Sequence, residues 1–409
     1  MASVPRATTA PQPTNAVPLA RLFAYTQSLG LERWLAQRKR GLSTLLLSLL
    51  WLALAWRGSG RPYHLSLLRE PLLAALLGRD RLPTAESVRR SLRYFPAQAV
   101  RRAVEAAYGA ELPRRAGRVW AALDSHQLPY WGRAKREELR KGWSGTHSRR
   151  LRGYRLYLAV DTDTGQIITF VLLRGHARDS RLTALLARHL RRQLGRRLAG
   201  IVADCGFTSR AAVAGLLEAG VPFILGFARS APVRAHLAAL TGQQRRWLQQ
   251  QGAIRLGLCA WDPRLQLLAL RARTPTDRRG PWVYVTSIQG RGPRQLAGLY
   301  RQRWRVEQAL DELVNGHDLD HLVSTRLAPN RIAVGFRLLA RDLAIGLQIR
   351  EADARPRVIQ EPYAFRATRV DGLGTFRQER RTLFLTPLQP TGPQRWRLPW
   401  ARRIVRLVA

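Results

Sequence analysis

Acidic side chains and cysteines are scarce in this chain of 409 residues. Only 27 residues are Asp or Glu, against 69 Lys or Arg, and the formal net charge is +42. The two cysteines, Cys205 and Cys259, have no second Cys or His at a metal-ligand spacing. The scarcity of cysteine argues against a disulfide framework and against a zinc finger, since each needs several such residues at defined spacings.

The chain also has few features that would export or anchor it. The apolar run from Leu45 to Trp56 is about a dozen residues long, whereas a membrane-spanning helix needs roughly 20, so it predicts a buried helix. The stretch from Ala2 to Pro18 is rich in Pro, Thr and Ala and lacks the apolar core of a signal peptide. We therefore expect a disordered leader over residues 1–18, no membrane association and a cytoplasmic location.

Positive charge is what the chain has in excess, and nearly all of it is Arg. Arg holds a phosphate through two parallel hydrogen bonds, and neutralising phosphates releases counterions. A genomic coding bias could explain the choice of Arg over Lys, but it does not explain the imbalance with acids. The charge predicts a nucleic-acid partner, and 46% hydrophobic residues predict folded domains rather than a disordered basic tail.

Residues 19–112 are expected to form a helical DNA-binding region. Within it, Glu70 to Leu77 predicts one helix, Gly78 to Pro83 a turn, and Thr84 the N-cap of a second helix. Helix, turn and basic helix together outline a helix-turn-helix, although any helical hairpin shares this outline. The basic residues that we expect to contact DNA are Arg89, Arg90 and Arg93.

From residue 118 the pattern changes to strands alternating with helices. Two of the strands end in an acid, Asp124 and Asp204, and carboxyl ends of strands are where such sheets present their sites. Asp179 is expected to cap the helix that follows the hairpin. The order predicts a mixed α/β sheet from strands at 119–123, 154–160, 166–173, 200–203 and 221–227.

The alternation is interrupted at about 230–290. A helical patch there leads into three strand-like runs, which predict a β-rich insertion within the α/β domain. At the other end, residues 351–409 are expected to form a basic C-terminal tail. Its Trp396 and Trp400 stand among arginines, so they could stack on bases or dock the tail onto the core.

The run Tyr-Arg-Gln-Arg-Trp-Arg-Val-Glu at 300–307 is the most informative feature of the chain. On a helical period, Tyr300, Arg303, Trp304 and Glu307 share one face, so one acid stands on an otherwise cationic helix. This face predicts the edge of an active site. The plain alternative is that Glu307 is a surface acid paired with Arg303 at i, i+4.

These residues resemble the DDE transposases of bacterial insertion sequences, specifically the IS4-like group. Its signature is Tyr, two residues, Arg, three residues, Glu, six residues and Lys, and Tyr300, Arg303 and Glu307 fit the spacing. Val314 stands where the Lys should be, so one phosphate contact is missing. Asp124 and Asp204, the latter in Val-Ala-Asp-Cys-Gly-Phe, match the first two acids.

The resemblance implies an RNase H-like catalytic core over residues 118–350 with Asp124, Asp204 and Glu307 as catalytic metal ligands. Carboxylate oxygens suit Mg²⁺, with Mn²⁺ able to substitute. Tyr300, Arg303 and Trp304 would contact DNA. The implied partners are double-stranded DNA with terminal inverted repeats and target DNA, bound by a homodimer in a synaptic complex in the bacterial nucleoid.

Other functions remain open at this point. The chain could be an RNase H-like nuclease that cuts without joining, or a DNA-binding regulator with a silent core. Asp124 and Asp204 could be cap or turn residues, and Asp311 and Glu312 lie close enough in sequence to compete with Glu307 as the third acid.

Overall fold

The structure of the protein is a computed structural model that describes most of the chain. By internal contacts the chain divides into two compact units: unit 1 comprises residues 1–115, 128–139 and 311–409, and unit 2 comprises 116–127 and 140–310. Residues 311–351 thus belong with the N-terminal helices, whereas the sequence grouped them with the catalytic core. The described residues are 8–14, 17–35, 44–59, 61–68, 71–79, 81–115, 117–271, 281–351, 374–379, 382–387, 394–398 and 403–407.

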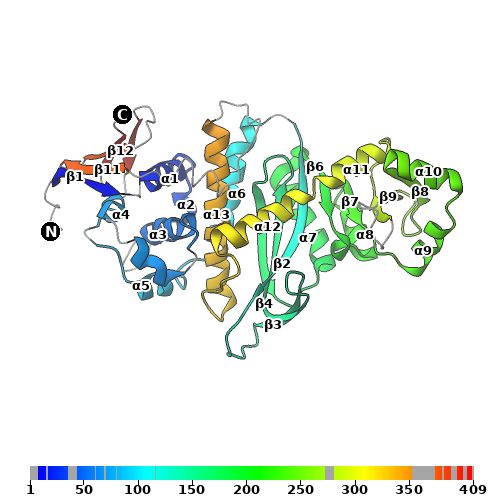
Figure 1. Cartoon of the computed structure of the whole chain (residues 1–409), viewed down its shortest axis with the longest axis horizontal. Helices are drawn as coiled ribbons and strands as arrows, with labels where there is room; N and C mark the ends of the chain where they lie inside the picture. The colour runs from blue at the N-terminus through cyan, green and yellow to red at the C-terminus, as the bar shows by residue number, and fades with distance from the viewer. Residues whose placement is uncertain are drawn as a thin grey trace. The chain divides into compact units, whose positions relative to one another are not determined.

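Helices make up most of unit 1 (Figure 1). The long helix α13 packs along α6 and α3, and the ring of Trp51 stacks on that of Phe336 with centroids 6.4 Å apart. The helical character predicted for residues 19–112 is therefore observed. The helices of this unit are α1 (Val17–Ser28), α2 (Glu32–Leu35), α3 (Thr44–Trp56), α4 (Pro71–Leu76), α5 (Ala85–Ser91), α6 (Ala99–Glu111), the last part of α12 (Trp304–His317) and α13 (Leu327–Glu351).

The apolar run from Leu45 to Trp56 lies in helix α3, which is buried in the core of unit 1. Leu49, Leu50 and Leu52 are fully buried. Packing on every side explains why this helix is apolar all round rather than along one stripe. None of the helices within the described ranges combines the length and the hydropathy that crossing a bilayer requires.

The basic hairpin of unit 1, which consists of α4, the connection after it and α5, has the predicted order of helix, turn and helix. Helix α4 ends at Leu76, and Thr84 caps α5 by accepting a hydrogen bond from the backbone N–H of Ser87 at 3.2 Å. Helix α5 ends at Ser91, so Arg93 lies in the turn that follows and not on the helix.

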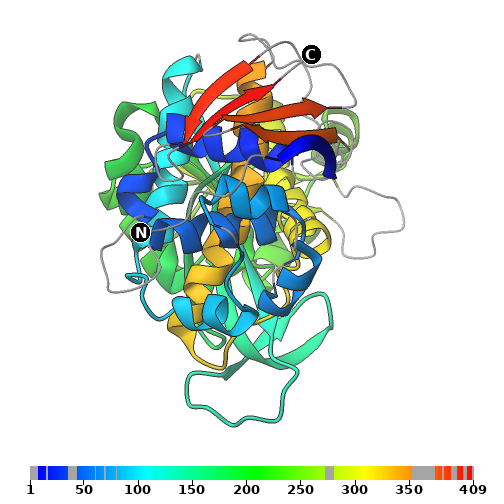
Figure 2. The same ribbon diagram turned by 90° about the vertical axis from the view of Figure 1, so that its left-hand side faces the viewer.

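The two ends of the chain form a sheet, which the sequence did not predict. Strand β1 (Thr8–Thr14) lies within the expected disordered leader and pairs antiparallel with β11 (Gly374–Glu379) (Figure 2). The expected basic tail supplies the other strands, β12 (Thr382–Pro387), β13 (Gln394–Leu398) and β14 (Arg403–Leu407). The prediction failed because edge pairing uses backbone hydrogen bonds, which composition does not reveal. Trp396 lies in β13, and Trp400 lies outside the described residues.

Unit 2 is built on a nine-stranded mixed sheet with the order β3-β4-β2-β6-β7-β10-β9-β8, in which β5 also pairs with β4 (Figure 1). Strands β2, β6 and β7 are parallel, and β4 and β5 form an antiparallel hairpin. The predicted mixed α/β sheet with flanking helices is confirmed. Its first strands are β2 (Val119–Pro129), β3 (Arg140–Ser144), β4 (Arg149–Asp161), β5 (Ile167–Arg174), β6 (Leu198–Ala203) and β7 (Phe223–Gly226).

Strands β6 and β7, in the centre of the sheet, are apolar along their whole length because both faces are covered. Ile201, Val202 and Ala203 of β6 are all fully buried. Helix α7 (Asp179–Leu194) packs against α8 (Arg210–Glu218), and both α7 and α11 (Pro293–Arg301) contact β6. This packing fixes the carboxyl end of β6, where Asp204 stands.

The β-rich segment at about 230–290 does not interrupt the sheet but extends it. Strand β10 (Trp282–Thr286) pairs antiparallel with β7, then β9 (Gln266–Leu270) and β8 (Ala253–Leu258) follow outward. Helices α9 (Ala231–Ala238) and α10 (Gly242–Gln251) cover it, and Leu248 packs with Ile254 and Ala269. The β-rich stretch predicted within the α/β domain is present, and its strands join the main sheet. The sequence did not reveal this pairing, because strand pairing across a long loop leaves no local signal.

Candidate active site

Asp124 lies inside strand β2 and not at its end, because β2 continues to Pro129. Its carboxylate Oδ1 accepts a hydrogen bond from the backbone N–H of Ser125 at 2.7 Å. The side chain is 18% exposed, so a charged carboxylate here loses most of its hydration.

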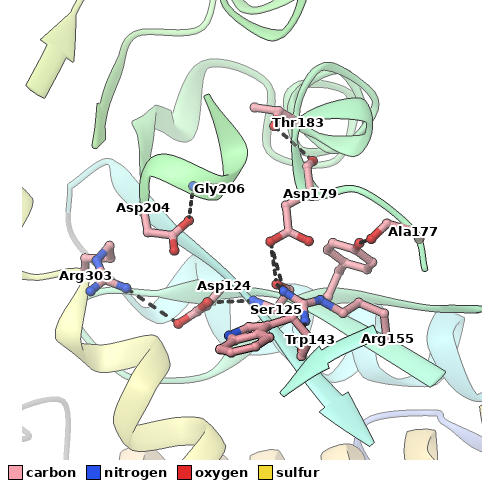
Figure 3. A network of polar contacts seen from close by, with 11 residues as sticks. Asp124, Ser125, Trp143, Arg155, Ala177, Asp179, Thr183, Asp204, Gly206 and Arg303 are labelled. Carbon is pink, nitrogen blue, oxygen red and sulfur yellow. Dashed lines mark hydrogen bonds and ion pairs between the residues drawn. The ribbon is translucent and has the colours of Figure 1, made fainter. Parts of the chain in front are cut away.

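Asp204 follows strand β6, which pairs parallel with β2. Its Oδ1 accepts the backbone N–H of Gly206 at 2.9 Å, so Asp204 caps the short turn Cys205–Phe207 (Figure 3). Asp204 is thus a cap residue, which was one of the alternatives that the sequence left open.

The two acids influence one another electrostatically. Burial, and then the negative charge of Asp204, raise the pKa of Asp124 to about 7, against the opposing effects of Arg303 and the Ser125 N–H. Burial also raises the pKa of Asp204, with a smaller contribution from Asp179 and an opposing one from Arg303. Two carboxylates that disfavour each other's ionisation are the arrangement that a cation stabilises.

We expected the signature segment, residues 300–307, to lie on one continuous helix, but the helix is broken within it. Helix α11 ends at Arg301, and α12 begins at Trp304. Between them the N–H of Arg303 bonds to the carbonyl of Tyr300 at 2.9 Å, which is the tighter i to i−3 pattern of a turn. The contacts of Arg303 with Tyr300 and Glu307 therefore arise across a helix break, and a 3.6-residue period does not describe them.

Arg303 joins the signature to the strand acids. Its Nη1 atom lies 3.5 Å from Oδ2 of Asp124, and its Nη2 atom donates a hydrogen bond to Glu307 (Figure 3 shows the contact with Asp124). Burial alone would lower the pKa of Arg303, but the neighbouring Tyr300, Glu307 and Asp124 raise it above its usual value. The guanidinium is thus held between two of the three predicted catalytic acids.

The aromatic residues of the signature differ in burial. The ring of Tyr300 lies 4.0 Å from that of Tyr284 and below the guanidinium of Arg303, and burial raises the pKa of its hydroxyl. Trp304 is exposed, with the guanidinium of Arg305 stacked 4.9 Å above its ring. Tyr300 therefore supports Arg303, whereas contact of the exposed Trp304 with DNA stays a prediction.

The donor set suits a divalent cation in part. Among the described residues, no three His, Cys, Asp or Glu side chains lie close enough together to hold one ion. Asp124 and Asp204 provide hard oxygen ligands whose mutual repulsion a cation would relieve. Glu307 is 48% exposed and bound to Arg303, so it would have to release this partner before it joined them.

Asp179 is a site residue that the sequence did not identify. It was expected to be an N-cap, but Arg178 occupies the N-cap position of α7, and Asp179 is the first helical residue. Its Oδ2 instead accepts hydrogen bonds from Ser125 and Arg155, at 2.9 and 3.1 Å (Figure 3). No sequence periodicity could reveal these contacts, because Ser125 lies on β2 and Arg155 on β4, whereas Asp179 lies on a helix.

The other acids near Glu307 have different surroundings. Glu312 accepts a hydrogen bond from the Nε atom of buried Arg341 at 2.6 Å, so it is a structural ion-pair residue of unit 1. Asp311 is exposed. Val314, which stands at the Lys position of the signature, is half-buried on α12.

The predicted DNA-contacting arginines of unit 1 are partly engaged. Arg89 and Arg90 both donate to Glu86, each with a shortest contact of 2.7 Å. The side chains of Arg89, Arg90 and Glu86 are all exposed, so these ion pairs are weak and can exchange for phosphate. Contact of Arg89, Arg90 and Arg93 with DNA stays a prediction.

Comparisons with known proteins identify the family of this chain and a similar fold. A protein-family profile described as "Transposase DDE domain" matches residues 117–343, more than half of the chain. Among solved structures, the cryo-EM structure of a piggyBac transposase synaptic complex with hairpin DNA resembles the chain with a TM-score of 0.51 and 14% identity, over 87% of this chain and 81% of that one. At this identity the likeness concerns the fold alone. No curated protein sequence matches the chain. The match over residues 117–343 shows that the chain belongs to the family of proteins that carry a transposase DDE domain.

Proposed function

We propose that this protein is a transposase that cuts DNA strands at the ends of a mobile element and transfers them into target DNA. We assign it to the IS4-like group of bacterial insertion sequences on the spacing of Tyr300, Arg303 and Glu307. The catalytic residues in this proposal are Asp124, Asp204 and Glu307.

The observation that carries the proposal is the relation between Asp124 and Asp204. Asp124 lies on β2 and Asp204 directly follows the neighbouring parallel strand β6, and the charge of Asp204 raises the pKa of Asp124. Paired buried carboxylates are costly to folding unless they serve a ligand. A regulator with a silent core would gain nothing from keeping them.

Each residue has a defined task in strand cleavage. Two divalent ions, Mg²⁺ or Mn²⁺, would activate a water or a 3′-hydroxyl and stabilise the leaving oxygen. Asp124 would contact both ions, while Asp204 and Glu307 would each hold one. Arg303 would turn from the carboxylates to the phosphate next to the scissile bond, since a guanidinium grips two phosphate oxygens at once.

DNA is the partner that the charge favours. A net charge of +42 cannot be balanced within the protein, and phosphates balance it while releasing counterions. The similar piggyBac structure is a synaptic complex with DNA, which supports a paired-end assembly here. We therefore propose terminal inverted repeats and target DNA as substrates, bound by a homodimer.

The test is cleavage of a supercoiled plasmid that carries the inverted repeats flanking the gene. With Mg²⁺ we expect nicking at the repeat ends, loss of cleavage in EDTA, and joining of the ends to a second plasmid. Cleavage without joining would instead identify a nuclease of this fold. End binding without any metal-dependent cleavage would identify a DNA-binding regulator.

A further inference from the structure

A fourth carboxylate, Asp179, stands beside two of the three proposed catalytic acids, Asp124 and Asp204. It is the first residue of the 16-residue helix α7, and its side chain is 13% exposed. A Cβ atom added to Gly206 would lie 3.0 Å from Oδ2 of Asp179 and 3.2 Å from Oδ1 of Asp204. The two carboxylates therefore face each other across a glycine, although Asp179 does not match the signature.

The Asp179 carboxylate fixes the hydroxyl of Ser125. Ser125 Oγ donates to Oδ2 of Asp179 at 2.9 Å and accepts from Nη2 of Arg155 at 2.8 Å (Figure 3). A hydroxyl has a single proton to donate, so these two bonds leave it one orientation. The same Nη2 atom also donates to Asp179 at 3.1 Å, which closes a three-membered network.

Ser125 passes this constraint to Asp124. Its backbone N–H donates to Oδ1 of Asp124 at 2.7 Å, and its side chain is held by the network. The route from Asp179 to the proposed catalytic acid therefore consists of two hydrogen bonds through one residue.

The network is itself held by elements of unit 2. Arg155 Nη1 donates to the backbone carbonyl of Trp143 at 2.7 Å, and Thr183 Oγ1 donates to the Phe207 carbonyl at 2.7 Å, one turn along α7 from Asp179. Arg155 and Asp179 are 16% and 13% exposed, so the opposite charges offset each other's loss of hydration. A helix cap would need none of these partners.

We propose that Asp179 is a positioning residue that, acting through Ser125, holds the carboxylate of Asp124 in its catalytic orientation. This inference rests on the proposed function of Asp124. Partners of this kind around metal ligands typically contribute about 10- to 100-fold in activity or metal affinity.

The first test is a double-mutant cycle in plasmid cleavage by the full chain. Asp179→Asn and Ser125→Ala should each reduce the cleavage rate roughly 10- to 100-fold, and the double variant should be no slower than the slower single variant. Ser125→Ala leaves no charge unpaired, so it remains informative if Asp179→Asn folds poorly. Glu218→Gln, which removes the same charge from an exposed site of unit 2, should cleave normally.

End binding and thermal unfolding separate positioning from a structural role. Both should be unchanged in Ser125→Ala, while the Mg²⁺ concentration for half-maximal cleavage rises. Losses that multiply in the double variant would overturn the proposal, since Asp179 would then act independently of Ser125. Normal cleavage in Asp179→Asn would overturn it as well.

The second test needs no DNA and no activity. Crystal structures of the wild type and of Asp179→Asn should show the Asp124 carboxylate rotated and its bond to the Ser125 N–H lost in the variant. An unchanged Asp124 would refute positioning even if cleavage were slow. If the wild type cleaves no DNA while the variant shows the rotation, the proposed function fails and the positioning of Asp124 stands.

Discussion

The Nη1 atom of Arg303 lies 3.5 Å from the Oδ2 atom of Asp124, and the same guanidinium also binds Glu307. Arg303 thus offsets the negative charges of Asp124 and Glu307, as divalent ions would do in the proposed active complex. If metal and DNA bind as proposed, Arg303 exchanges its partners, and its replacement should affect both the free and the DNA-bound protein.

We expect Arg303→Ala to reduce end cleavage by about 100-fold or more while overall DNA affinity changes little. One phosphate contact among many adds little to binding, but it sets the position of the reacting group. Arg303→Lys should recover only part of the rate, because an ammonium cannot bridge two oxygens as a guanidinium does. Cleavage rates and filter-binding constants measured on the same ends decide the matter, and a parallel loss of both would point to a structural Arg303.

The second prediction concerns stability and pH. The pKa of Asp124 is raised from 3.8 to about 7, so the folded state holds this proton more tightly than the unfolded state does. The contribution of this bound proton to the free energy of unfolding is complete below pH 4 and is lost as the pH rises through 7. In EDTA, Asp124→Asn should therefore be more stable than the wild type at pH 8, by an amount on the order of 4 kcal/mol, since the shift spans about three pKa units and each unit corresponds to about 1.4 kcal/mol.

Denaturant unfolding at pH 4 and pH 8 provides the measurement. The difference between variant and wild type should be near zero at pH 4 and grow with pH. A difference that does not depend on pH would contradict the electrostatic origin. Cleavage by Asp124→Asn should be absent at both pH values.

Local signals explain what the sequence predicted well. Thr84 caps α5 through the N–H of Ser87, and the apolar run ending at Ala203 forms β6 with Asp204 directly after it. In each case the pattern of neighbouring residues determines the structure. Asp204 therefore lies where the sequence predicted it, directly after its strand, whereas Asp124 lies inside a longer strand than predicted.

Long-range pairing explains what the sequence did not predict. Asp179 turns towards Ser125, which is 54 residues away in sequence, and β10 joins the sheet by pairing with β7. The break at Gln302–Arg303 also escaped prediction, because the residues there favour a helix and carry neither Gly nor Pro. Such features depend on partners that only folding brings together.

The third prediction distinguishes the acids of helix α12. Glu307→Ala should abolish cleavage and leave stability unchanged, whereas Asp311→Ala, an exposed acid on the same helix, should have no effect. Glu312→Ala should lower stability by about 3 kcal/mol, because it removes a partner of buried Arg341. Cleavage assays combined with thermal unfolding separate the three variants. Near-normal cleavage by Glu307→Ala would show that the third acid is assigned wrongly.

The fourth prediction tests the basic hairpin of unit 1. Glu86 neutralises Arg89 and Arg90, so Glu86→Gln should free both for phosphate and increase DNA affinity by roughly 2- to 10-fold. The dependence of log affinity on log salt should steepen by about 1, and Arg93→Ala should make it shallower by a similar amount. If affinity is insensitive to both Glu86→Gln and Arg93→Ala, this hairpin does not contact DNA.

The last prediction uses the glycine between the carboxylates. A Cβ at position 206 would lie 3.0 Å from Asp179 and 3.2 Å from Asp204, so Gly206→Ala should push the two side chains apart by a few tenths of an ångström. The fold should tolerate this shift, but metal ligands and their partners must be placed to within about 0.5 Å, so cleavage should fall by roughly 10-fold or more. Gly298→Ala is the matched control, because its Cβ would meet no atom within 4 Å. Equal cleavage rates for the two alanine variants would mean that the spacing of Asp179 and Asp204 does not matter for the reaction.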